Sequence, residues 1–341
     1  MGKSARRFLI LIFFFSLFSM LLAIRSQNAA EIISRSVCVF VREAVGSLSS
    51  LFPVSVFELI ILSSPITVFL AIRYVVKGDK SIRTRFFRLI SCFSVIPTLF
   101  FLTVGIPAQR YPIARVGESY PSSEELIVCA EKLIDKVNLQ AASADFDISL
   151  ENLRAELQAS YSEISSRFNL CVKQLPRAKI LLLPELASRL GILGHYSFVT
   201  GEININTDAP RYTLPFTMAH EYAHYLGASS EAEAGFLAFV ACMSSEAAYI
   251  KYSGALSTLE YFLSDVYSCD RKEYERLYSS LSELGRANLR ESYEYLSKYS
   301  ETRIYKFADG INSSYIDAFD KNGSYSYSAI CRYVTQYLLY S

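Results

Sequence analysis

Three long apolar stretches dominate the first third of the chain, at about residues 8–24, 52–76 and 86–106. The first contains no charged residue, and the other two are interrupted only by isolated charges and prolines. Each stretch is close to the ~20 residues that a helix needs to cross a bilayer. A large soluble core is the alternative, but three such stretches before a chain of ordinary polarity favour transmembrane helices.

The pattern changes after residue 107. Alternation of apolar and polar residues over Gly201–Asn206 predicts a strand with one buried face, and Lys179–Leu183 predicts a second short strand. Elsewhere the pattern predicts helices, whose starts are marked by capping residues at Ser122, at Asp147 or Ser149, and at Asp270. We therefore expect a mainly α fold with a small β-sheet, of the α+β class. Residues 108–341 are long enough for one domain with a sizeable core, behind a membrane region at 1–107.

Two of the three histidines in the chain, His220 and His224, stand four residues apart in an H-E-x-x-H motif. Four residues make about one turn of a helix, so both imidazoles project from one face and can share a Zn²⁺ ion. Glu221 lies one step round the helix and is placed to take a proton from metal-bound water. A helix that carries two histidines by chance is the alternative.

The surroundings of the motif favour the functional interpretation. The helix is predicted to begin at Thr213 or Leu214, to carry Pro215 in its first turn and to end at Gly227. It follows the predicted strand and a turn-rich segment. Strand, loop and H-E-x-x-H helix is the order that zinc-dependent peptidases use, so the motif lies in its expected context.

A zinc site of this kind needs a third protein ligand and one open position for water. The next predicted helix, from Ser229 onward, is apolar on nearly all sides and should be buried. Glu233 would be a buried carboxylate at its start, and a metal would remove the cost of burying it. Glu233 is therefore the predicted third ligand, although Ser230-x-x-Glu233 also forms a capping box. Glu231 is the first alternative, and His195, otherwise an ordinary loop or substrate-rim residue, is the second.

Basic residues set an expected orientation. The N-terminal tail is basic, and six lysines and arginines lie between the second and third stretches or in their adjoining ends, at positions 73, 77, 80, 83, 85 and 88. Such segments remain in the cytoplasm, so three spans place the domain after residue 107 outside it. Cleavage of the first span as a signal peptide would leave that side unchanged. Residues 31–51 carry an interrupted apolar stripe, which suits a helix at the membrane surface.

Composition excludes some classes of function. The net charge of +1 and the lack of a basic stripe give no support for a nucleic-acid partner. Five of the seven cysteines lie after residue 107, without the paired C-x-x-C spacing of a zinc ribbon. The expected partners are a peptide or protein substrate and the lipid bilayer.

The chain resembles a bacterial membrane-bound family of HExxH proteins described as a domain of unknown function. The resemblance extends over most of the chain, through the apolar N-terminal third and the segments Phe52–Ser55, Gly194–Glu202, Leu214–Thr217, Glu231–Ala234, Asn322–Gly323 and Ser326–Tyr327. It implies a zincin-like metallopeptidase domain of the gluzincin type, with His220, His224 and Glu233 as ligands and Glu221 catalytic. Family members often have Asn after the Glu-Ala pair where this chain has Gly235, which affects the hydrogen-bonding support of Glu233.

Together these features predict a membrane-anchored zinc peptidase in the cell membrane, with several spans and an extracytoplasmic catalytic domain. Zinc would lower the pKa of its water to about 7, and Glu221 would move the proton to the leaving amine. A phenol is expected to stabilise the oxyanion, with Tyr327 and Tyr196 as candidates among 24 tyrosines. The edge of the Glu202–Asn206 strand is expected to pair with an extended substrate.

Two other classes of function remain open. A catalytically silent scaffold or sensor would keep zinc for structure alone, although an intact Glu221 argues against this. A transporter or channel component would need a polar pathway, but the apolar stretches hold Glu58 and no array of charged residues.

Overall fold

The computed structural model describes residues 2–76, 81–114, 116–117, 119–302, 305–306, 309–310 and 326–340, with the backbone alone at 326–328. The chain divides into two compact units. Unit 1 comprises Met1–Tyr111 together with Ser197–Glu202, and unit 2 comprises Pro112–Tyr196 and Ile203–Ser341. The described residues are mostly helical, with one small sheet, as the sequence predicts.

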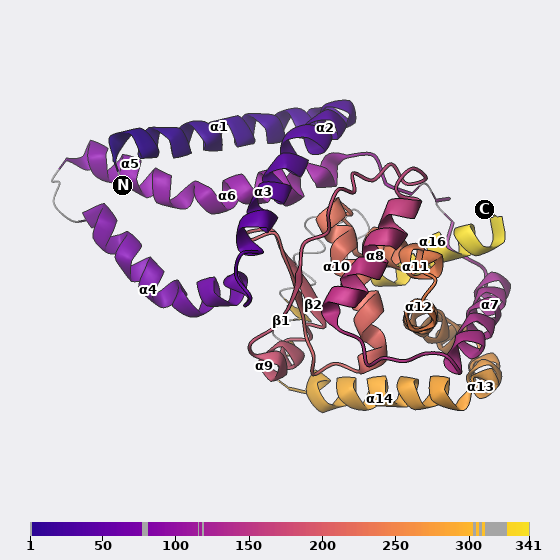
Figure 1. The fold of residues 1–341 in the computed structure, drawn as a ribbon. Helices are drawn as coiled ribbons and strands as arrows, with labels where there is room; N and C mark the ends of the chain where they lie inside the picture. The colour runs from indigo at the N-terminus through magenta and orange to yellow at the C-terminus, as the bar shows by residue number, and fades with distance from the viewer. Residues whose placement is uncertain are drawn as a thin grey trace. The chain divides into compact units, whose positions relative to one another are not determined.

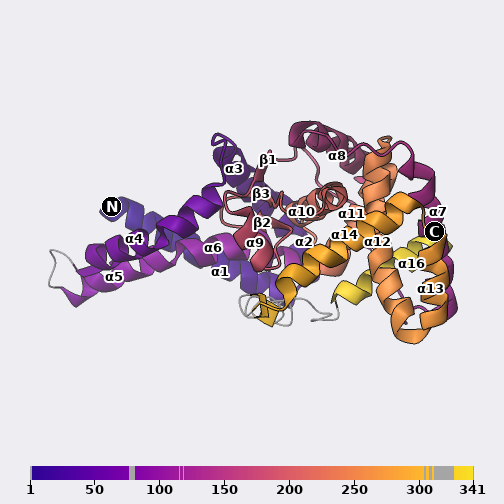
Figure 2. The ribbon, with the colours of Figure 1, turned by 90° about the horizontal axis from the view of Figure 1, so that it is seen from below.

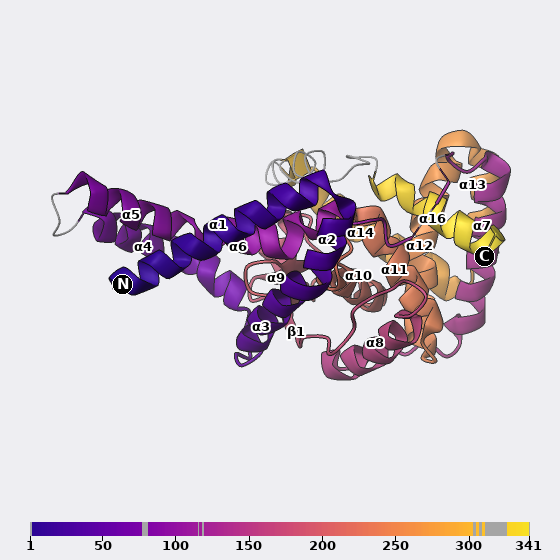
Figure 3. The same ribbon diagram turned by 90° about the horizontal axis from the view of Figure 1, so that it is seen from above.

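Unit 1 contains three helices that are long and apolar enough to cross a membrane, at Lys3–Arg25, Val56–Val76 and Ile82–Gln109. The first two are α1 and α4, and the third comprises α5 (Ile82–Phe93), α6 (Val95–Phe100), a π-helical turn (Phe101–Gly105) and a 3₁₀ turn (Pro107–Gln109). Within the unit, α1 lies along α5 and α6, and α4 contacts α5 (Figures 1 and 3). No residue of α4 is buried, as expected of a helix that faces lipid. Lys77 and Lys80 of the basic segment lie outside the described residues.

Between α1 and α4 the chain is helical through α2 (Gln27–Ile33), a π-helical turn (Ser34–Cys38) and α3 (Val39–Ser49). This region coincides with the helix predicted for residues 31–51. The Glu31 carboxylate accepts two hydrogen bonds from Arg110, with Nε at 2.9 Å and Nη2 at 3.1 Å. This bidentate pair ties α2 to the end of the third apolar helix.

The helices of unit 2 begin where the sequence places their caps. The Ser122 hydroxyl accepts from the Glu125 N–H in a full capping box, Ser149 caps the next helix, and Asp270 caps a third. The helices are α7 (Ser123–Ala141), α8 (Leu150–Ile164), α9 (Pro184–Arg189), α10 (Leu214–Leu226), α11 (Glu231–Ser244), α12 (Ala248–Cys269), α13 (Arg271–Ser280), α14 (Glu283–Ser300) and α16 (Ser326–Tyr340).

The core of unit 2 surrounds α11. Of its 14 residues, 11 are buried, which confirms the prediction of a buried apolar helix. It packs against α10, α12, α8 and α16, while α7 lies against α12 (Figure 2). The first turn of α11 is therefore fixed beside α10.

The sheet has three strands in the order β1-β3-β2, with β1 at Ala178–Ile180, β2 at Gly194–Ser197 and β3 at Glu202–Ile205. β1 pairs with β3 in parallel (Figure 2). β3 confirms the predicted strand, but it lies between the other two. The expectation that this strand offers a free edge to a substrate is therefore wrong, because both of its edges are already paired.

Candidate metal centre

The motif helix α10 forms as the sequence predicts. Pro215 lies in its first turn, and Gly227 ends it in the left-handed conformation at φ 107°, which glycine adopts without strain. Two buried phenols fix the helix: the Tyr161 hydroxyl donates to the Ala219 carbonyl at 2.6 Å, and the Tyr222 hydroxyl donates to the Pro176 carbonyl at 2.9 Å. The helix is thus held firmly on the side away from its histidines.

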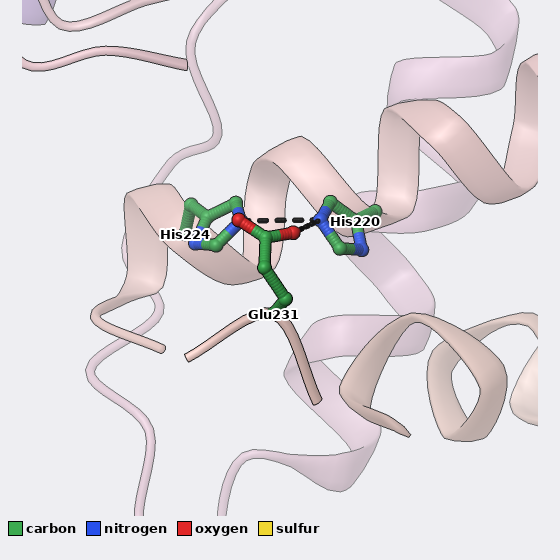
Figure 4. A group of neighbouring side chains, drawn as sticks. All are labelled: His220, His224 and Glu231. Atoms are coloured by element: carbon green, nitrogen blue, oxygen red, sulfur yellow. Dashed lines mark hydrogen bonds and ion pairs between the residues drawn. The ribbon is translucent and has the colours of Figure 1, made fainter. Parts of the chain in front are cut away.

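The two histidines of the motif meet at their Nε2 atoms, which are 3.1 Å apart (Figure 4). His224 Nδ1 lies 3.0 Å from the Ala228 carbonyl oxygen, so it is the protonated ring nitrogen when the ring is neutral. That contact leaves Nε2 of His224 as the lone-pair donor. A carbonyl behind a histidine is the arrangement by which proteins orient metal-binding imidazoles.

The third side chain at this position is Glu231, which Figure 4 shows reaching both rings from the start of α11. Its Oε2 lies 3.1 Å from His220 Nε2, and its Oε1 lies 3.6 Å from His224 Nε2. Among the described residues, this is the group whose ligand atoms could hold a metal ion.

The donor atoms match the dimensions of a zinc site. Ligands bound at 2.0–2.1 Å around a tetrahedral zinc ion lie about 3.3–3.4 Å from one another. The distance between the two Nε2 atoms, 3.1 Å, and those from Glu231 Oε2 to His220 and from Oε1 to His224, 3.1 and 3.6 Å, are close to that value, so both carboxylate oxygens face the position. Two imidazoles and one carboxylate are also a ligand set typical of hydrolytic zinc sites, which leaves a fourth position for water.

The structure does not bring Glu233, the predicted third ligand, to the two histidines. Its carboxylate accepts the backbone N–H of Ile113 at 2.8 Å, and its own N–H donates to the Ser230 hydroxyl at 3.1 Å. Residues two positions apart on a helix point in directions that differ by about 200°, so Glu231 and Glu233 cannot both face the histidines. Burial does impose a cost on Glu233, and the hydrogen bond from the Ile113 backbone N–H helps to offset it.

Within the cluster, Glu231 and His224 stabilise each other's charged forms. Burial raises the pKa of Glu231, but the charge of His224 and hydrogen bonds from both histidines outweigh burial and hold that pKa far below its usual range. Burial lowers the pKa of His224, whereas Glu231 and the charge of Glu221 overcome it and raise the pKa to about 9. Glu231 and His224 are thus an ion pair, and a metal ion that bound to His224 would displace the proton of its ring.

Glu221 lies beside the cluster but outside it. Its Oε2 accepts the backbone N–H of Tyr196 at 2.7 Å, and the side chain is buried. Burial raises the pKa of Glu221, and the charges of the two histidines oppose that rise. Gly194 allows this approach, because a Cβ there would lie 2.7 Å from Thr217 Cγ2 and 3.0 Å from Glu221 Cγ. The backbone of β2 therefore fixes the carboxylate of Glu221, which extends from α10.

The other predicted site residues lie elsewhere or stay open. Tyr196 follows His195 in β2, and its ring meets that of Tyr225 edge to face at 6.0 Å between centroids. His195 is not part of the cluster. The side chain of Tyr327 lies outside the described residues, as do Asn322 and Gly323. The oxyanion-stabilising phenol stays a prediction.

Gly235, which stands where Asn is expected, lies against a side chain of α16. A Cβ at this position would lie 2.6 Å from Ile330 Cδ1 of α16 and 3.9 Å from His220 Nδ1. Glycine thus leaves room for the Ile330 side chain, whose flexible end would have to shift to admit a larger residue.

The fold and the site define a mostly helical protein with three helices long enough to cross a membrane and a histidine–glutamate cluster in its second unit. The chain belongs to the family described as "Protein of unknown function (DUF3810)", whose model matches residues 33–335. No curated protein and no solved structure matches the chain. The match confirms the resemblance to a family with a domain of unknown function, and it assigns no activity.

Proposed function

We propose that the protein is a membrane-anchored zinc-dependent metallopeptidase, with His220, His224 and Glu231 as ligands and Glu221 as general base. The observation that carries this proposal is the convergence of two Nε2 atoms and one carboxylate at 3.1–3.6 Å, with a second acidic group, Glu221, held beside them. The set combines a metal site and a proton acceptor, which hydrolysis of a peptide bond requires.

Bound zinc supplies a Lewis acid that activates water and polarises the scissile carbonyl. The protein's own residues do the remaining work. Glu221 accepts the proton of the attacking water and passes it to the leaving amine. The Tyr196 N–H fixes one carboxylate oxygen of Glu221 and leaves the other for the proton. The Ala228 carbonyl keeps the His224 ring in the tautomer that can bind metal.

The proposed substrate is an extended segment of a peptide or protein. β2 ends the strand order and lies beside Glu221, whereas β3 is paired on both sides. An extended chain along β2 would bring a peptide carbonyl close to the catalytic glutamate. Backbone pairing of this kind gives affinity with little dependence on side chains.

The proposed location is the cell membrane, with the catalytic unit outside the cytoplasm. The three apolar helices support membrane association, and the basic segment from Arg73 to Arg88 supports the orientation. A reporter that is active only outside the cytoplasm, fused after Ser341, should give a strong signal. A strong signal from a cytoplasm-only reporter at that position would reverse the proposed orientation.

The proposed activity is tested with Glu221→Gln in the full-length protein purified in detergent. Glutamine keeps the size of the side chain and its contact with the Tyr196 N–H, but it cannot accept the proton. We expect unchanged zinc content and melting temperature, with peptide hydrolysis reduced by roughly 10²-fold or more. The double variant His220→Ala, His224→Ala is the control that should lose zinc as well.

The outcomes separate the two classes of function. Equal turnover in the wild type and Glu221→Gln would remove Glu221 from the chemistry. Absence of turnover in both, across a broad peptide library and with zinc bound, would favour the silent zinc-binding scaffold or sensor. Stoichiometric zinc in the double histidine variant would refute the site itself.

A further inference from the structure

The turn between β2 and β3 belongs to a different unit from the strands that flank it. The chain leaves unit 2 after Tyr196, and the segment Ser197–Glu202 is part of unit 1. The chain returns to unit 2 at Ile203. The residue directly before this crossing, Tyr196, is the one whose N–H holds Glu221.

Within unit 1, the turn binds the start of the second apolar helix. The Glu202 carboxylate is buried and accepts the Val56 N–H at 3.0 Å and the Phe57 N–H at 2.8 Å. The Thr200 hydroxyl donates to the same carboxylate at 2.8 Å. A carboxylate at this position satisfies free N–H groups at the start of α4 and complements the helix dipole. Glu202 and the start of α4 therefore meet within unit 1, although Val56 and Glu202 are 146 residues apart in sequence.

Two further contacts of unit 1 fix the rest of the turn. Phe198 packs edge to face on Phe100 at 5.7 Å between ring centroids, and its carbonyl accepts from Thr103 at 3.4 Å. Gly201 has φ +65°, and a Cβ on it would lie 2.6 Å from the backbone nitrogen of Gly46. Backbone cannot move aside as a side chain can, so the turn fits against α3 in one position.

We infer that Glu202 and Gly201 are positioning residues, which set the Tyr196 N–H and thereby the Glu221 carboxylate according to the position of the membrane helices. The turn is short, and its Ser197 hydroxyl accepts the Thr200 N–H at 3.2 Å, so it passes on a displacement rather than absorbing it. A displacement of α4 or α3 would move Tyr196 relative to Glu221. The catalytic base is thus coupled to the membrane-spanning part of the same chain.

The test compares Glu202→Ala and Gly201→Ala in the full-length, zinc-loaded protein in detergent. Glu202→Gln is the conservative variant, which keeps one acceptor oxygen. Ser26→Ala is the matched control, because Ser26 caps α2 in the same unit, accepting from the Ala29 N–H, without touching the turn. Two quantities are measured: amide hydrogen exchange at Tyr196, and kcat and KM for a peptide.

We expect Glu202→Ala and Gly201→Ala to speed exchange at the Tyr196 amide by roughly tenfold or more, since its hydrogen bond to Glu221 is loosened. The same variants should lower kcat by about tenfold with zinc content and KM unchanged, because a misplaced base slows the chemical step. Glu202→Gln should lie between these variants and the wild type, and Ser26→Ala should match the wild type.

Only the kinetic measurement rests on the proposed function. Unchanged exchange at Tyr196 in both alanine variants would overturn the inference, as would an equal change in Ser26→Ala, which would indicate general loosening of unit 1. If the wild type hydrolyses no peptide, the proposed function fails, and hydrogen exchange alone then decides whether the turn holds Tyr196. If either alanine variant fails to fold, Glu202→Gln supplies the comparison.

Discussion

The helices α4 and α11 begin with the same sequence signature but use it in opposite ways. Each has a Ser-x-x-Glu start, Ser55 to Glu58 and Ser230 to Glu233, in which the serine accepts the N–H of the glutamate at 3.1 Å. At α4 an acidic side chain from another segment, Glu202, binds the helix end. At α11 the helix's own acidic side chains reach outward, Glu231 to the histidines and Glu233 to the backbone N–H of Ile113.

The two helices also differ in what surrounds them. Both are largely apolar, but α4 buries no residue, while α11 is buried almost throughout. Apolar composition therefore does not distinguish a helix in lipid from a helix in a protein core. Length does in this case, since α4 has 21 residues and α11 has 14, too few to cross a bilayer.

The largest expected effect comes from matched leucines in the two helices. Leu237 in α11 is fully buried, whereas Leu70 in α4 is 54% exposed. Leu237→Ala leaves a cavity and should lower the free energy of unfolding by about 2–5 kcal/mol. Leu70→Ala leaves none, since lipid or detergent refills the space, and should lower it by less than about 1 kcal/mol. Denaturant unfolding of the full-length variants in detergent gives both values, and equal losses would show that α4 is packed like α11.

A smaller effect is expected from the two serine caps. Ser230→Ala and Ser55→Ala should each lower stability by about 1 kcal/mol. Only Ser230→Ala should also weaken zinc binding, because the first turn of α11 carries Glu231. Competition with a chelator measures zinc affinity, and thermal unfolding measures stability. A similar loss of zinc affinity in Ser55→Ala would contradict the separation of the two helix starts.

The smallest effect is a pH dependence at Glu260 of α12. Its carboxylate accepts from Tyr212 at 2.5 Å and Ser292 at 3.2 Å, but burial outweighs these bonds and raises its pKa above the ordinary 4.5. The folded state thus favours the protonated form of Glu260. The free energy of unfolding therefore falls as the pH rises from the ordinary pKa through the raised one.

Glu260→Gln should therefore match the wild type in stability near pH 4 and exceed it near pH 7. Melting temperatures of both proteins across this range provide the measurement. A difference that shrinks as the pH rises would mean that the folded state stabilises the charged form of the Glu260 carboxylate.

Much of the fold follows from sequence patterns because the patterns reflect local physics. The caps at Ser122, Ser149 and Asp270, the left-handed glycine at 227 and the alternation in β3 each depend on neighbouring residues. The partner of each acidic side chain depends on distant segments. Glu233 is bound by Ile113, and Glu202 by Val56, 146 residues away in sequence.

One local signal did bear on the third ligand. Ser230 caps α11 by accepting the N–H of Glu233, which makes Glu233 the third residue of the helix and Glu231 the first. The link from Gly227 to Ser230 is short, so the first residue of α11 lies next to the last turn of α10. The serine cap therefore favours Glu231 over Glu233, whereas burial indicates only that a carboxylate needs a partner.

The most direct test of the proposed metal centre is zinc stoichiometry in the matched variants Glu231→Gln and Glu233→Gln of the full-length protein. Both remove one acidic group from the first turn of α11, two residues apart, and keep its size. We predict that Glu231→Gln purifies with little zinc and without peptide hydrolysis, while Glu233→Gln retains one zinc ion per chain. Full zinc in Glu231→Gln together with its loss in Glu233→Gln would contradict the ligand set and restore Glu233 to the metal.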